Sequence, residues 1–216
     1  MRGYGMTRQE IVKISGIPSG KMLTTALANL SSCGFIREYN DYHAKQRKLI
    51  YQLTDFFTLF YFHFLRKNSF LQMQSWTGLQ RTPAFYTWAG YSFELLSLQH
   101  VNQIKQSLGI SGVLTNLFSW RCKGPESKGA QIDLIIDRND NTINICEMKF
   151  AENEFVVSSD YEQTLRNKIA AFVSNIHPRK SVLLTMVTTF GVKRNIHSGI
   201  IQSEVTMEEL FKPSVP

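Results

Sequence analysis

The sequence contains little cysteine and no long apolar run. Its three cysteines, Cys33, Cys122 and Cys146, lie far apart and form no C-x-x-C pair, so neither a disulfide framework nor a zinc site is indicated. No apolar stretch approaches the roughly 18–20 residues that span a bilayer, and the first residues lack the apolar segment of a signal peptide. We therefore expect a cytoplasmic protein without a membrane partner.

The sequence also lacks a phosphate-binding loop for ATP. The segment 16–22 (GIPSGKM) is similar to one, but three residues separate its two glycines where the motif requires four. Met22 stands where a Ser or Thr would hold magnesium. We therefore expect no ATPase site in this chain.

Acidic residues are scarce in the first two-fifths of the chain. Residues 1–88 contain 11 Lys and Arg against 4 Asp and Glu, whereas residues 89–216 contain 13 of each kind. The whole net charge of +7 therefore lies in the first part. A basic segment of this kind favours a polyanionic partner, DNA above all. The alternative is a basic surface that only aids solubility.

The basic part has the pattern of a winged helix-turn-helix. Thr7 and Glu10 have the spacing of a capping box, which predicts a helix over 7–14. After a break at Pro18, we expect Ser19 to cap a second helix that ends near Ser32. The predicted inner face of the second helix consists of Met22, Leu23, Ala26, Leu27 and Leu30. Two strands, at 35–39 and 49–53, with a basic turn between them complete the pattern.

In such a domain the second helix enters the major groove and the hairpin touches phosphates. The predicted DNA-binding residues of the second helix are Ser19, Lys21, Thr24 and Thr25. The predicted phosphate contacts in the turn are Lys45, Arg47 and Lys48. A winged helix can also serve protein contact, and this alternative stays open.

An aromatic segment follows the basic part. Residues 54–67 predict a helix that opens at Thr54 and is apolar on so much of its circumference that we expect it to be buried between domains. Residues 68–88 predict a linking segment in which Pro83 marks a helix boundary. We therefore predict three parts: a winged helix-turn-helix at 1–54, an aromatic helical connector at 55–88, and a third domain at 89–216.

The most informative pattern of the third domain is the stretch 129–150, two apolar strands joined by a polar turn. If this hairpin is symmetric about Asp140, Asp133 lies opposite Glu147, and Lys149 projects from the same face as Glu147. Two facing carboxylates repel each other, and a divalent cation removes that repulsion. The pattern predicts an Mg²⁺ or Mn²⁺ site. The alternative is an ion pair between Glu147 and Lys149 on a solvated face.

The remaining elements predict an α/β chain, α+β overall, with a mixed sheet. We expect a helix at 89–108, two weaker strands near 113–122, a helix at 158–176 and an apolar strand at 181–187, the last two forming a βαβ unit with the hairpin. From 89 to about 190, this order resembles the PD-(D/E)xK nuclease superfamily. The resemblance implies a restriction-endonuclease-like sheet flanked by helices and an Mg²⁺-dependent endodeoxyribonuclease.

The residues that carry this resemblance are few. Asp133 matches the first motif, and Glu147-Met148-Lys149 matches the second. Glu94 matches an acidic residue of the preceding helix and would be a further metal ligand. Gln163, or in its place Lys168, matches the polar residue of the following helix, and Asp137 is a substitute ligand. The resemblance also includes catalytically silent members, so a silent module for DNA binding, protein interaction or regulation is the alternative.

A wider resemblance covers nearly the whole chain. The basic winged helix, an aromatic helix that opens with the residues at 51–57 (YQLTDFF) and the nuclease-like domain together resemble the C-terminal half of a prokaryotic AAA-type ATPase family. This resemblance implies that the chain is a fragment or a separately encoded remnant. It also implies an ATPase domain, in cis or in trans, as a partner besides DNA. Homo-oligomer formation is left open.

Overall fold

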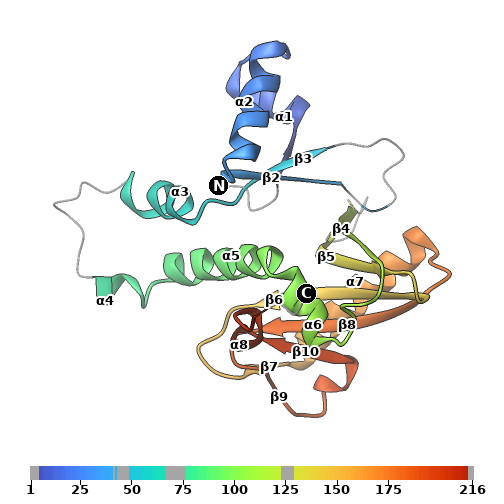
Figure 1. Ribbon diagram of the computed structural model, residues 1–216. Coiled ribbons are helices and arrows are strands. Elements are labelled where there is room, and N and C mark those ends of the chain that lie inside the picture. Colours follow the sequence, from blue (N-terminus) through green and yellow to red (C-terminus); the bar gives the residue numbers. More distant parts are fainter. Residues whose placement is uncertain (1–4, 41, 43–48, 67–75, 123–128, 214–216) are drawn as a thin grey trace. The chain divides into compact units, whose positions relative to one another are not determined.

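The computed structural model describes residues 5–40, 42, 49–66, 76–122 and 129–213 (Figure 1). The predicted phosphate contacts Lys45, Arg47 and Lys48 lie outside these residues. The chain divides into two compact units, Met1–Ser92 and Phe93–Pro216. Both units combine helices and strands, and the larger sheet is mixed, so the chain has the mixed α/β architecture that the sequence predicted.

The first unit begins with a small antiparallel sheet and two helices. The sheet has the order β1-β3-β2, with β3 paired on both sides. In chain order the elements are β1 (Met6–Thr7), α1 (Arg8–Ser15), α2 (Lys21–Ser32), β2 (Ile36–Tyr39) and β3 (Ile50–Leu53). Two helices followed by two paired strands are the elements that the sequence predicted for this part.

The ends of α1 and α2 follow from capping. The predicted capping box forms between Thr7 and Glu10, and α2 ends before Gly34, whose φ of 74° suits a glycine. The predicted start of α2 is wrong, because the N-cap is Gly20 and no side chain caps this helix. The Ser19 hydroxyl instead accepts a hydrogen bond from Arg8 Nε at 3.1 Å.

The apolar face of α2 is narrower than predicted. Leu23 and Leu27, four residues apart, are its buried residues. Met22 and Leu30, which were expected on the inner face, are 66% and 41% exposed, and Ala26 is exposed too. A buried stripe one residue wide leaves apolar side chains of α2 on the surface.

The aromatic segment forms two short helical pieces. Helix α3 (Phe56–Phe60) is capped by Asp55, whose carboxylate accepts from Thr58 N at 2.6 Å, and it continues as a π-helix, η1 (Tyr61–Leu65). Of the aromatic side chains, Phe64 is buried, whereas Phe57 is 69% exposed. Within the first unit the segment is therefore only partly covered.

The next helices are α4 (Trp76–Leu79) and α5 (Pro83–Gln99). Pro83 is the first residue of α5, as predicted, since a proline at this position loses no helical hydrogen bond. The boundary between the two units falls within α5. The helix predicted over 89–108 is interrupted at His100, which has φ −110° and ψ 31°, and α6 (Val101–Ser107) follows.

The second unit is built on a five-stranded sheet with the order β10-β8-β6-β5-β4 (Figure 1). Strands β4, β5 and β6 are antiparallel, and β6, β8 and β10 are parallel. The predicted βαβ unit is confirmed, with α7 joining β6 to β8. The elements of the sheet and its crossover helix are β4 (Thr115–Cys122), β5 (Ala130–Arg138), β6 (Thr142–Lys149), α7 (Ser159–Ile176), β8 (Ser181–Thr188) and β10 (Ser203–Thr206).

Shorter elements complete the second unit. Strands β7 and β9 form a two-stranded parallel sheet. The two weaker strands expected near 113–122 are one strand, β4, with a bulge between Phe118 and Trp120. The shorter elements are β7 (Phe155–Val156), β9 (Val192–Lys193), the 3-10 helix η3 (Ser198–Ile200) and α8 (Met207–Leu210). No helix among the described residues is long and apolar enough to cross a membrane.

The hairpin of β5 and β6 has the predicted register. Its pairs run from Asp137 opposite Ile143 to Leu134 opposite Cys146, symmetric about Asp140. Because side chains alternate between the faces of a strand, Leu134 and Cys146 belong to one face, where they join a core with helical residues such as Ile104 of α6. Asp133 and Glu147 belong to the other face, which the crossover helix α7 covers.

Candidate acidic site on strands β5 and β6

Asp133 and Glu147 lie at facing positions of the hairpin. They are the next residues of the two strands beyond the pair Leu134–Cys146, so the register of the hairpin sets them opposite each other. Glu147 is 6% exposed, and Asp133 is half-buried. Gln131, two residues along β5 on the same face, donates a hydrogen bond from Nε2 to Asp133 Oδ1. The structure therefore brings two carboxylates into one poorly solvated place.

Glu147 is held by three side chains. The Tyr161 hydroxyl donates to Glu147 Oε1 at 2.8 Å, and Lys149 Nζ lies 3.3 Å from the same oxygen. Lys168 Nζ forms an ion pair and hydrogen bond with Glu147 Oε2. Lys149 Nζ also lies 5.2 Å from the centroid of the Tyr161 ring, so Tyr161 contacts both motif residues.

The spacing of α7 explains why Tyr161 and Lys168 reach the sheet. Leu165 and Phe172 are the buried residues of this helix. Tyr161, Leu165, Lys168 and Phe172 follow one another at intervals of four, three and four residues, which places them on one helical face. The Ser158 hydroxyl fixes the start of the helix by accepting from Tyr161 N at 3.2 Å. The sequence contained this stripe, and it would have singled out Tyr161 and Lys168.

The two carboxylates have opposite pKa shifts. Burial raises the pKa of Asp133, and repulsion from Glu147 adds to it, although Gln131 and the two lysines act in the other direction. Burial alone would raise the pKa of Glu147 too, but the charges of Lys168 and Lys149 outweigh it and lower this pKa. Burial, followed by the nearby Glu147 charge, raises the pKa of Tyr161, which therefore stays protonated and donates.

Two predicted site residues lie elsewhere. Gln163 is exposed on α7 and donates from Nε2 to Asn167 Oδ1 at 2.9 Å. It is two residues from buried Leu165, so it belongs to another side of the helix, and Lys168 is the α7 residue at Glu147. Glu94 is half-buried on α5, directly after Phe93 of the core on the opposite sheet face. The structure does not gather Glu94 with Asp133 and Glu147.

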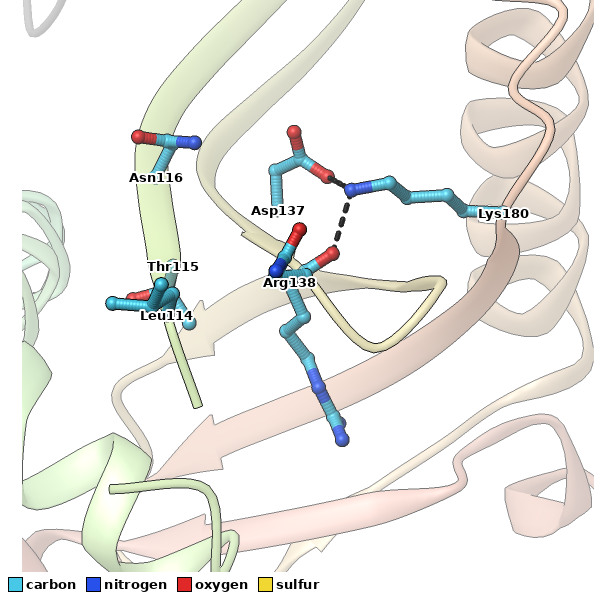
Figure 2. A pocket seen from close by; sticks show the side chains of 7 residues that line it. Leu114, Thr115, Asn116, Asp137, Arg138 and Lys180 are labelled. Atoms are coloured by element: carbon cyan, nitrogen blue, oxygen red, sulfur yellow. Dashed lines mark hydrogen bonds and ion pairs between the residues drawn. The ribbon is translucent and has the colours of Figure 1, made fainter. Parts of the chain in front are cut away.

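Asp137, the substitute ligand, belongs to a different place on the hairpin. It is four residues along β5 from Asp133, about 13 Å at the rise of a strand. Figure 2 shows Lys180 pointing to it, with Nζ 2.6 Å from Asp137 Oδ1 and 2.6 Å from the Arg138 carbonyl oxygen. These side chains line a pocket of about 310 Å³ together with Leu114, Thr115, Asn116 and Asn139.

Asp133 and Glu147 are the two carboxylates that a divalent cation would meet on this face. The described residues contain no group of three His, Cys, Asp or Glu side chains that could hold a metal, so Asp133 and Glu147 would be the acidic ligands. Mg²⁺ is commonly bound by one or two carboxylates while it keeps several waters or takes substrate phosphates. Asp133, which forms no ion pair among the described residues, offers the charge that such a cation would offset. The two carboxylates have the chemistry to hold a hard, largely hydrated cation, provided that it displaces a side chain from Glu147, whose two oxygens are both engaged.

Two of the predicted DNA-facing residues, Ser19 and Thr24, contact Arg8. Its guanidinium donates to Ser19 Oγ, to the Gly20 carbonyl at 3.1 Å and to Thr24 Oγ1 at 2.8 Å. Arg8 therefore ties α1 to the start of α2. Lys21 and Thr25 are exposed on α2.

Comparisons with known proteins add little to this geometry. No protein-family model matches the chain, and no curated protein matches it. The crystal structure of AF1548, a protein of unknown function, is similar over 53% of this chain and 64% of that chain, with 13% sequence identity and a TM-score of 0.37. The chain thus spans less than two-thirds of that protein, and a likeness of this degree carries neither fold nor function across.

Proposed function

We propose that the chain is a DNA-binding protein whose second unit hydrolyses phosphodiester bonds with Mg²⁺ or Mn²⁺ at Asp133, Glu147 and Lys149. The observation that carries this proposal is Asp133: a half-buried carboxylate that faces a second carboxylate and pairs with no cation among the described residues. Such an arrangement costs free energy. Costly charges of this kind are typical of functional sites.

We assign the second unit to the restriction-endonuclease-like fold, with a mixed sheet between α7 on one face and α5, α6 and α8 on the other. The first unit is assigned to the winged helix-turn-helix class, supported by two helices and a sheet of order β1-β3-β2. The proposal keeps the resemblance to the C-terminal part of AAA-type ATPases, and with it an ATPase domain as a partner.

Each side chain has a stated task in this proposal. Asp133 and Glu147 hold the cation, which when bound supplies charge neutralisation at the phosphodiester group. Lys149, placed by Glu147 and by the Tyr161 ring, donates to the phosphate oxygens or orients the attacking water. Tyr161 fixes Glu147 Oε1. These tasks require the side chains on one face of β5 and β6 and on the facing side of α7.

DNA binding is assigned to the first unit. Lys21, Thr24 and Thr25 are exposed on α2, and residues 1–88 carry the whole net positive charge. An exposed helix of this composition suits the major groove, while lysine contacts to phosphates supply affinity that falls with salt. DNA is therefore the polyanion that the proposal brings to the acidic site.

The proposal is tested by incubating the purified chain with supercoiled plasmid and Mg²⁺ or Mn²⁺. Nicked or linear products are expected from the wild type and should be lost in Lys149→Met. Lys180→Met is the matched control, because Lys180 also pairs with a carboxylate of the hairpin, Asp137 of β5, but lies at a separate pocket. Equal cleavage by wild type and Lys149→Met would remove Lys149 from the proposed chemistry.

A second candidate is a catalytically silent module that binds a protein partner. Two observations favour it. Both oxygens of Glu147 are already engaged by side chains of the chain, and α1 and α2 expose Ile14 at 63% and Met22 at 66%. Exposed apolar side chains near a basic surface are suited to protein contact. Absence of cleavage by the wild type, with either metal, would favour this candidate.

A further inference from the structure

We propose that Lys168 is an internal competitor of the divalent cation, holding Glu147 when no cation is present and releasing Glu147 Oε2 when one binds. This inference concerns regulation of the acidic site and rests on the proposed function. Lys149 is assigned to the phosphate oxygens or the attacking water, whereas Lys168 is proposed to lower the affinity of the site for the metal.

The first step is the contact itself. Lys168 Nζ lies within hydrogen-bond distance of Glu147 Oε2, and their side chains are only 16% and 8% exposed. An ammonium group there neutralises a carboxylate oxygen that a cation would also need. The two cations cannot share that oxygen without strong repulsion in a poorly solvated place.

The second step is the balance of charge. Asp133 and Glu147 supply two negative charges, and Lys149 and Lys168 supply two positive ones. The site is therefore neutral before a cation enters, and a divalent cation adds two positive charges. Moving Lys168 away reduces that excess, so entry of the cation and departure of Lys168 are thermodynamically linked.

The third step is that Lys168, in contrast to Lys149, directly contacts one group of the site among the described residues, although its charge also acts to lower the pKa of Asp133. Lys149 contacts both Glu147 Oε1 and the face of Tyr161, whereas Lys168 contacts Glu147 through Oε2. Its long side chain projects from α7, next to exposed Arg166 and Asn167. A rotation about its flexible stem would take the ammonium group toward solvent, or toward a phosphate group of an incoming nucleic acid.

The test measures Mn²⁺ binding to the full chain by the electron paramagnetic resonance signal of free Mn²⁺. Lys168→Met is expected to bind Mn²⁺ roughly tenfold more tightly than the wild type, a coupling of ordinary size. Lys168→Arg keeps the charge and should bind like the wild type. Lys180→Met, which breaks the ion pair with Asp137, is the matched control and should also bind like the wild type.

Folding of each variant is checked by circular dichroism, and Lys168→Gln replaces Lys168→Met if the latter does not fold. Unchanged, weaker or absent Mn²⁺ binding in the folded, uncharged variant would overturn the inference. An equal gain in Mn²⁺ affinity in Lys180→Met would overturn the inference too. It would show that the loss of any positive charge in the second unit raises the affinity, wherever that charge lies.

Plasmid cleavage measured alongside separates the inference from the proposed function. If the wild type cleaves DNA but Lys168→Met does not bind Mn²⁺ more tightly, the proposed role of Lys168 is wrong while the proposed nuclease function stands. A tenfold gain in affinity without cleavage by any variant supports the role of Lys168 and removes the nuclease proposal.

Discussion

Neutralising Glu147 and neutralising Asp133 should shift the free energy of unfolding of the second unit in opposite directions. In Glu147→Gln the ammonium groups of Lys168 and Lys149 lose their partner. Breaking a buried ion pair by removing one member costs about 3–5 kcal/mol. Because the Lys168 side chain is 16% exposed and the Lys149 side chain 35%, water recovers part of this cost, and we expect a loss of about 2 kcal/mol.

In Asp133→Asn the outcome is reversed. The amide keeps the size of the carboxylate and an oxygen that can accept from Gln131. It removes a half-buried charge that faces Glu147 and has no ion pair among the described residues. We expect a gain of about 1 kcal/mol at neutral pH, in the range of substitutions that relieve a functional constraint.

The pH dependence follows from the direction of each pKa shift. The pKa of Glu147 is lowered in the folded chain, so its stabilisation is present above its unfolded pKa of about 4.3 and is lost as the pH falls through the folded value. The pKa of Asp133 is raised in the folded chain. Ionised Asp133 therefore does not destabilise the wild type below its unfolded pKa of about 3.9, and the free energy of unfolding decreases as the pH rises through the folded value. Both variants should therefore approach the wild type in acid.

The assay is urea unfolding followed by tryptophan fluorescence in a Trp76→Phe, Trp88→Phe background. Trp120 is then the sole tryptophan of the chain, and it is buried in the second unit against Phe172. If Asp133→Asn destabilises the unit as strongly as Glu147→Gln does, Asp133 belongs to a purely structural network and the reasoning fails.

Three further predictions concern the packing of α7, its hydrogen bond to Glu147, and DNA binding by α2. Tyr161→Phe keeps the ring beside Phe155 but loses the 2.8 Å hydrogen bond to Glu147, so unfolding should be about 1–2 kcal/mol easier; unchanged stability would show that the bond contributes nothing. Phe172→Ala empties a fully buried position and should cost about 3–5 kcal/mol, whereas a loss below about 1 kcal/mol would contradict the packing of α7. Lys21→Ala should weaken duplex DNA binding in anisotropy titrations and lower the salt slope by about 1, with exposed Lys193→Ala in the second unit as control; equal effects of both would contradict a specific contact by α2.

The register of the β5–β6 hairpin could be predicted from the sequence because it depends only on residues close to the turn. Asp140 and Asn141 lie in the turn, and Asn141 adopts φ 62°, a conformation that asparagine tolerates. Once the turn is fixed, alternation along β5 and β6 determines that Asp133 faces Glu147. Both the register and the pairing of the carboxylates are therefore consequences of a few neighbouring residues.

Which residues of α7 reach the acidic pair depends on which face of the helix is buried, and the match to the family motif did not take this face into account. Gln163 matched a family position, but the helix is oriented by the burial of Leu165 and Phe172, and these residues select Lys168 and Tyr161. On α2 the error was of another kind. Met22 and Leu30 are apolar at helical spacing, yet the packing of the first unit buries only Leu23 and Leu27, and sequence periodicity does not tell how much neighbouring structure covers a face.

Cleavage of duplex DNA by Asp133→Asn tests the central claim most directly. This variant is predicted to fold and to be at least as stable as the wild type, so loss of activity cannot be attributed to unfolding. With Mg²⁺ or Mn²⁺, the proposed function predicts cleavage by the wild type and none by Asp133→Asn. Cleavage by both at equal rates would contradict an acidic site built on Asp133 and Glu147.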